Sequence, residues 1–127
     1  MRVAEQPQTG AGKGFQGYEH AAGRFYPDDV IANCGTFRDA CALAWENRVN
    51  PSLTFQMLAV MADLQPQHVG EYFQRDPLNS KGNARRPLPA EKLHAVEAVL
   101  GNRILSQYLM HRGSLTIFEA VVAARGA

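Results

Sequence analysis

The sequence predicts an all-α protein: a compact bundle of about five helices containing a helix-turn-helix, with a flexible amino-terminal arm and an extra carboxyl-terminal helix. Three observations predict this class. From Thr36 onward, apolar residues recur at three- and four-residue intervals. Prolines, glycines and capping residues separate the periodic stretches. The stretch 58–73 joins a short apolar helix to a second helix that begins with polar residues.

The 127 residues divide into three predicted parts. Residues 1–24 form a flexible arm, because the first 23 residues hold five glycines and show no apolar periodicity. Residues 25–113 form the helix-turn-helix domain, and residues 114–127 form the extra helix. Within the domain, the stretch 25–31 is expected either to make a helical turn opened by Pro27 or to pack across the domain surface.

The first long helix is predicted from Thr36 to about Arg48. Thr36 is in position to cap its amino end, with Asp39 three residues later as its partner. The segment 50–52 interrupts the helix, because the proline at its centre disfavours helix in the residue before it.

The helix-turn-helix is predicted from helices over 54–62 and 66–74. The turn covers 63–65, Pro66 suits a first helical position, and Pro77 stops the second helix. Ala59 and Ala62 are small where two helices must approach closely. The positions that would fill a three-helix core are apolar, namely Leu58, Leu64, Val69 and Tyr72.

Three further elements follow the motif. Residues 78–87 are polar and basic and predict an exposed loop, after which a helix opens at Pro89 and ends at Gly101. Another helix runs from Arg103 to about Arg112 and is closed by Gly113. A last helix begins at a capping box of Thr116 and Glu119. Its apolar residues, Leu115, Ile117, Phe118, Val121 and Val122, make it the candidate dimerisation element.

Composition limits the function classes. The formal net charge is +1, but the segment 74–92 carries five basic residues against two acids, directly after the second helix of the motif. The amino terminus lacks an apolar leader and no apolar run is long enough for a membrane span, which predicts a cytoplasmic protein. Cys34 and Cys41 are expected to be buried thiols. Neither a metal site nor a cofactor is predicted.

The stretch from Phe37 to Gly113, about three fifths of the chain, resembles the DNA-binding domain of lambda-repressor-like (Cro/C1, XRE-type) regulators, especially those carried by prophages. The resemblance is carried by Leu58-Ala59, Ala62, Leu64, Val69 and Tyr72. Two positions depart from the family pattern. Asp63 stands where the family usually has glycine, and Phe55 stands where it often has a glutamine that touches phosphate, with Gln56 adjacent.

The resemblance implies a sequence-specific regulator of transcription that binds double-stranded DNA as a homodimer and is not an enzyme. In that family the start of the second motif helix enters the major groove. The expected base-contacting residues are Gln65, Gln67, His68 and Glu71. The expected backbone-contacting residues are Gln56, Arg75, Lys81, Arg85 and Arg86.

Two alternatives compete with this interpretation. The same helix pair can serve a protein-interaction module, such as an antitoxin or a phage adaptor, with the apolar carboxyl-terminal segment as its contact surface. The glycine-rich sequence over 12–17 fits the pattern GxGxxG of nucleotide-binding enzymes. No strand is predicted before it and no long helix after it, so the context for such a site is missing.

Overall fold

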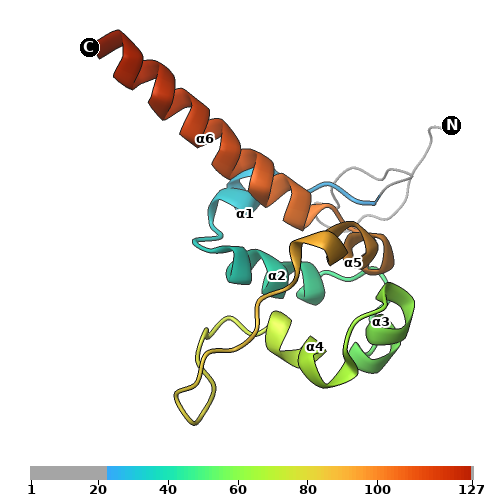
Figure 1. The fold of residues 1–127 in the computed structure, drawn as a ribbon. Helices are drawn as coiled ribbons and strands as arrows, with labels where there is room; N and C mark the ends of the chain where they lie inside the picture. Colours follow the sequence, from blue (N-terminus) through green and yellow to red (C-terminus); the bar gives the residue numbers. More distant parts are fainter. Residues whose placement is uncertain (1–22, 127) are drawn as a thin grey trace, which may run out of the picture.

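A computed structural model describes residues 23–126 (Figure 1). Within this range the chain forms six α-helices, one 3₁₀ helix and two isolated β-bridges, which confirms the predicted all-α class. Most of the predicted arm lies outside the described residues. The elements are α1 (Asp28–Ala32), α2 (Phe37–Glu46), α3 (Phe55–Ala62), α4 (Pro66–Tyr72), η1 (Ala90–Lys92), α5 (Leu93–Leu100) and α6 (Ile104–Gly126).

The predicted capping box opens α2. The backbone N–H of Asp39 donates to Thr36 Oγ1 over 3.1 Å, and the backbone N–H of Thr36 donates to Asp39 Oδ2 over 3.1 Å. Two of the orphan donors at the helix start are thereby satisfied. The helix ends at Glu46, two residues before the predicted end.

The core draws on every α-helix. Side chains that are almost fully buried include Ile31, Cys41, Leu58, Val69, Val96 and Ile104. Burying an aliphatic side chain of this size contributes about 1.5–3 kcal/mol relative to leaving it exposed. An aromatic group beside this core joins α2 to α3 and to the residue that follows α4, since the ring centroid of Phe55 lies 4.3 Å from that of Trp45 and 5.8 Å from that of Phe73. Phe55 therefore packs into the domain and does not face outward as a phosphate-binding glutamine would.

Helices α3 and α4 form the predicted helix-turn-helix. Thr54 caps α3 by accepting from the backbone N–H of Met57 over 3.1 Å. Asp63 ends α3 in the left-handed conformation, with φ 56°, as the tolerance of Asp for that geometry allows. Pro66 occupies the start of α4, and α4 ends at Tyr72, two residues before the predicted end.

The predicted break at Gly113 is wrong. Helix α6 runs without interruption from Ile104 to Gly126, so the separate helix starting at Thr116 does not exist. Thr116 Oγ1 instead donates to the carbonyl of Arg112, one turn earlier, over 3.0 Å. A single glycine inside a helix costs only about 1 kcal/mol, and Gly113 lacks the positive φ that ends a helix.

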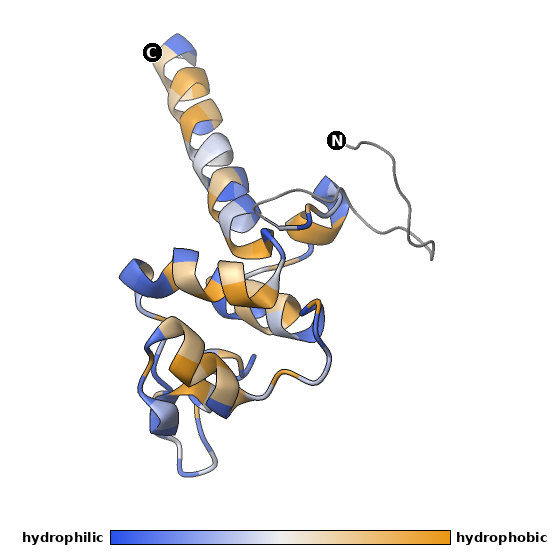
Figure 2. Cartoon of the chain, turned by 90° about the vertical axis from the view of Figure 1, so that its right-hand side faces the viewer, coloured by the Kyte–Doolittle hydropathy of each residue, from blue (hydrophilic) through white to orange (hydrophobic). Residues whose placement is uncertain are grey.

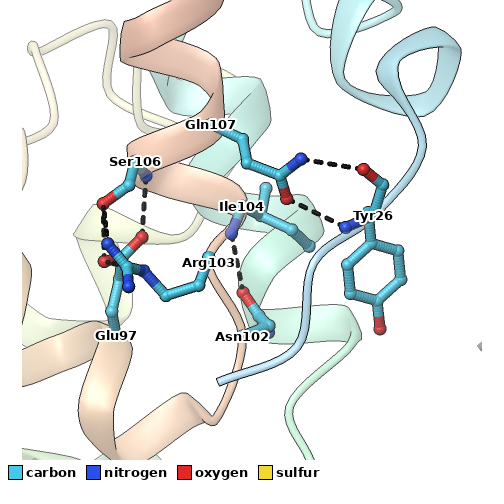
Figure 3. Close-up of polar contacts among 7 residues, drawn as sticks. All are labelled: Tyr26, Glu97, Asn102, Arg103, Ile104, Ser106 and Gln107. Carbon is cyan, nitrogen blue, oxygen red and sulfur yellow. Dashed lines mark hydrogen bonds and ion pairs between the residues drawn. The ribbon is translucent and has the colours of Figure 1, made fainter. Parts of the chain in front are cut away.

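A buried polar cluster fixes the beginning of α6 (Figure 3). Asn102, fully buried, donates to the carbonyls of Ala44 and Asn47 and accepts from the backbone N–H of Ile104. Glu97 of α5 accepts from both the backbone N–H and the hydroxyl of Ser106, each over 2.7 Å. This cluster sets the direction in which α6 leaves the domain.

The same region holds the start of the described chain. The Gln107 amide exchanges two hydrogen bonds with the backbone of Tyr26, over 2.8 and 2.9 Å (Figure 3). The backbone N–H of Arg24 donates to the carbonyl of Gly101. Gly23 and Arg24, which the sequence assigned to the arm, thus lie against the α5–α6 turn. Among residues 23–126, no helix combines the length and apolarity needed to cross a membrane.

Candidate nucleic-acid interface

The first turn of α4 presents polar side chains to solvent. Gln65 and Gln67 are exposed, and His68 is half-buried. Gln65 has extended backbone geometry and its side chain makes no capping hydrogen bond to the helix. Behind this turn, Val69 is fully buried and holds α4 against the core. Three of the four predicted base-contacting side chains therefore gather at one exposed end of a helix.

Glu71, the fourth predicted base-contacting residue, is engaged within the molecule. Its Oε1 accepts from the backbone N–H of Arg86 over 2.8 Å, and its Oε2 accepts from the Arg86 guanidinium over 3.1 Å. The backbone hydrogen bond from Arg86 is the main reason that the pKa of this carboxyl lies below its ordinary value. Glu71 thus connects α4 to the chain fifteen residues later.

The basic segment after α4 lies at the surface, as predicted for an exposed loop, and its residues 77–86 form an ordered hairpin. Leu78 and Ala84 form an antiparallel bridge, and the backbone N–H of Asn79 donates to the carbonyl of Asn83 over 2.8 Å. The Asn79 side chain accepts from the backbone N–H of Lys81 over 2.9 Å, and Gly82 completes the turn with φ 80°. Lys81 is held at the exposed tip.

Arg38 of α2, which the sequence analysis missed, fastens this hairpin to α4. Its Nη1 donates to the carbonyls of Glu71 and Gln74, over 2.6 and 2.9 Å. Its Nη2 donates to the carbonyls of Arg85 and Arg86, each over 2.9 Å. A planar guanidinium suits such a fork, because its donors are fixed in direction. All four acceptors are backbone carbonyls distant in sequence, so no residue pattern could have identified them.

The predicted backbone-contacting residues lie at the surface in different settings. The Arg75 guanidinium pairs with Glu46, and its hydrogen bond is the main cause of the lowered pKa of Glu46. Arg85 Nη1 donates to the carbonyl of Asp76, and Arg86 pairs with Glu71. Gln56 is exposed in the first turn of α3. The hairpin and α4 lie at the same end of the molecule, away from the carboxyl end of α6 (Figure 1).

In the described part of the chain, the other histidines and the cysteines form no comparable group. Cys34 and Cys41 are buried free thiols, as predicted, and burial raises the pKa of Cys41 to about 12. Among residues 23–126, no cluster of His, Cys, Asp and Glu is arranged to hold a metal ion. The glycine-rich stretch 12–17 lies outside the described residues.

The chain matches no family model, and comparisons with curated proteins and with solved structures found no significant similarity. Function is therefore inferred from the residues of the chain and from their arrangement.

Proposed function

We propose that this protein is a sequence-specific regulator of transcription, of the type carried by phages and mobile elements, which binds double-stranded DNA through α4 and the 77–86 hairpin. The observation that carries the proposal is the exposure of Gln65 and Gln67 on the first turn of α4, beside an ordered basic hairpin. Short helices of this kind place their first residues against base edges in the major groove.

Base recognition falls to three side chains. The carboxamides of Gln65 and Gln67 can each make a bidentate pair with adenine, and His68 can donate to an acceptor of guanine. One good bidentate pair contributes about 1–3 kcal/mol of discrimination against a wrong base. Glu71 is not among the proposed base-contacting residues, because both of its carboxylate oxygens accept from Arg86. It acts instead as a brace between the reading helix and the hairpin.

Backbone contacts would come from Gln56 and the cationic residues around the hairpin. Lys81 at the exposed tip is the best placed to meet a phosphate, and the guanidinium groups of Arg75, Arg85 and Arg86 lie at or near the surface. Such contacts supply affinity and register but no direct sequence information. A single short helix makes few base contacts, so we propose that two copies bind half-sites about one helical turn of DNA apart.

Selection of bound fragments from random double-stranded DNA tests the proposal, followed by affinity measurements on the selected site. Gln67→Ala should remove the preference for one or two base pairs and leave non-specific binding intact. Gln74→Ala is the matched control, since Gln74 is an exposed glutamine just after α4. If no sequence is enriched, or if Gln67→Ala prefers the same site as the parent, α4 is not the reading helix.

The outer face of α3 supports a second candidate, a protein-interaction module. Val60 and Met61 are 78% and 60% exposed, and Met57 beside them is 42% exposed. An apolar face that includes flexible methionines is typical of surfaces that bind other proteins. This alternative predicts a protein partner whose co-purification survives nuclease treatment and is lost in Val60→Asp, whereas DNA selection would enrich nothing.

A further inference from the structure

Helix α6 leaves the domain after its first two turns. Leu105 and Tyr108 are buried against the core, whereas every described side chain from Arg112 to Arg125 is exposed. Figure 1 shows this part of α6 projecting from the other helices, and Figure 2 shows hydrophobic residues along much of its length. Ile117 and Phe118 remain 67% and 66% exposed. Large apolar side chains in such a run are unusual on a surface without a partner.

The exposed residues form a stripe with the spacing of a helix-helix seam. Successive steps of four, three, four and three residues lead through Met110, Ser114, Ile117, Val121 and Ala124. Phe118 and Val122 widen the stripe on one side. At about 100° per residue, Arg112 and Glu119 lie on the opposite side of the helix. The side of α6 that faces water in a pair thus carries charges of both signs, and the five residues along the centre of the stripe are uncharged, with Arg125 on the flank beside Phe118.

We propose that this stripe, the α6 seam, packs against the α6 seam of a second copy of the chain, with the two helices parallel. The seam side chains present no charges that would repel in a self-complementary contact, and small residues at Ser114 and Ala124 permit close approach. A second copy of the chain can therefore cover this apolar surface, and no partner of opposite charge is required.

The exposed apolar area of α6 is large enough for an interface with a second copy of the chain. Met110, Ile117, Phe118, Val121 and Val122 are each between about half and three-quarters exposed. Complete coverage of these five side chains in both copies would remove on the order of 1,000 Å² from water, which is about the minimum for a specific interface. Helices in proteins gain most of their stability from packing of an apolar face, so pairing also stabilises the projecting part of α6.

The parallel direction rests on the proposed function. Parallel helices place the two domains, and hence the two α4 helices, at the same end of the pair, where both can reach one face of a DNA duplex. An antiparallel pair would separate the two domains along the length of α6. The self-association itself does not depend on DNA binding, so the two proposals can fail separately.

Sedimentation equilibrium of the full chain without DNA tests the association. We expect a dimer, or a larger even assembly, that dissociates on dilution, and a paired substitution Ile117→Glu with Val121→Glu that remains monomeric. Thr116→Glu is the matched control because it adds a charge away from the seam. A parent chain that is monomeric at all accessible concentrations would overturn the proposal, and so would a mass unchanged by the seam substitutions. Binding of the monomeric parent to lipid vesicles would assign the stripe to a membrane surface.

Disulfide crosslinking tests the direction. In a parallel pair the two copies of residue 114 face each other, so Ser114→Cys should form a covalent dimer under mild oxidation. Glu119→Cys, on the opposite side, should not crosslink above background, and the native thiols contribute little because both are buried. If Ser114→Cys fails to crosslink with itself while crosslinking to an Ala124→Cys chain, the helices are antiparallel. Crosslinking together with failed DNA selection would contradict the proposed function and would still support pairing through the α6 seam.

Discussion

The α5–α6 turn and the 77–86 hairpin are both held by polar side chains, but these side chains are buried at the turn and partly exposed at the hairpin. At the turn, Glu97 is 3% exposed and Asn102 is fully buried, so their hydrogen bonds are made away from water. At the hairpin, the Glu71 carboxylate and the Arg86 guanidinium remain 29% and 58% exposed. Both regions contain an ion pair with similar geometry, 3.2 Å at the turn and 3.1 Å at the hairpin.

The difference concerns what each contact controls. A buried polar group that loses its partner cannot turn to water, so its loss lowers the stability of the whole fold. An exposed pair exchanges its partner for water at little cost, so its loss changes the position of the hairpin more than the stability. The turn therefore determines whether the domain folds, and the hairpin contacts determine where a basic surface lies relative to α4.

The largest expected effect is at the turn. Glu97→Ala should lower the free energy of unfolding by about 3–5 kcal/mol, because it breaks a largely buried ion pair. It leaves Arg103 Nε and the backbone N–H of Ser106 without their acceptor. Urea unfolding followed by circular dichroism measures the loss. Ser106→Ala, which removes one hydroxyl donor and keeps the carboxylate paired, should cost much less. Equal losses for the two variants would contradict the importance of the buried charge.

An intermediate effect is expected at Arg38. Arg38→Ala should destabilise the fold by about 1–2 kcal/mol, since the hydrogen bonds of a charged donor contribute more than neutral ones but these are only partly buried. The hairpin should lose its fixed position, so hydrogen exchange at Arg85 and Arg86 should accelerate while exchange in α5 changes little. Arg38→Lys is the control, because an ammonium keeps the charge but cannot serve four carbonyls in a fixed fork. Exchange as slow in Arg38→Ala as in the parent would show that the four hydrogen bonds of Arg38, the Arg38 clamp, do not hold the hairpin.

Much of the fold was predictable because its signals are local. The capping box at Thr36 and Pro66 at the start of α4 follow from short-range geometry, and the structure confirms both. The false stop at Gly113 came from the same reasoning. A glycine ends a helix only when it adopts positive φ, as Gly101 does with φ 82°, and the residue type does not reveal which glycine will.

The candidate interface was predictable only in part. The exposed polar start of α4 follows from helical spacing, because Val69 and Tyr72 must face the core. The engagement of Glu71 by Arg86 was missed, because both residues appear in sequence as ordinary surface charges. Their contact depends on the path of the hairpin, which the Arg38 clamp fixes through backbone carbonyls. Long-range contacts to backbone atoms leave no mark in residue composition.

The smallest expected effect is at Glu71, and it depends on pH. The pKa of Glu71 is lowered in the folded state, so the folded protein holds this proton less tightly than the unfolded chain does. Its stabilising contribution is therefore complete above the ordinary value of 4.5 and is lost as the pH falls through the lower folded-state value. Glu71→Gln should flatten this acid dependence of the unfolding free energy, because it removes a small contribution near pH 7 and leaves stability at low pH unchanged. Glu46→Gln is the matched control, because it removes another carboxyl of lowered pKa that lies away from the hairpin.

Only Glu71→Gln should also accelerate hydrogen exchange at the Arg86 amide at neutral pH, since that amide donates to Glu71. If both variants leave this exchange rate unchanged, the Glu71 carboxylate does not hold the hairpin. The proposed difference between the buried contacts of the α5–α6 turn and the exposed contacts of the hairpin would then be wrong.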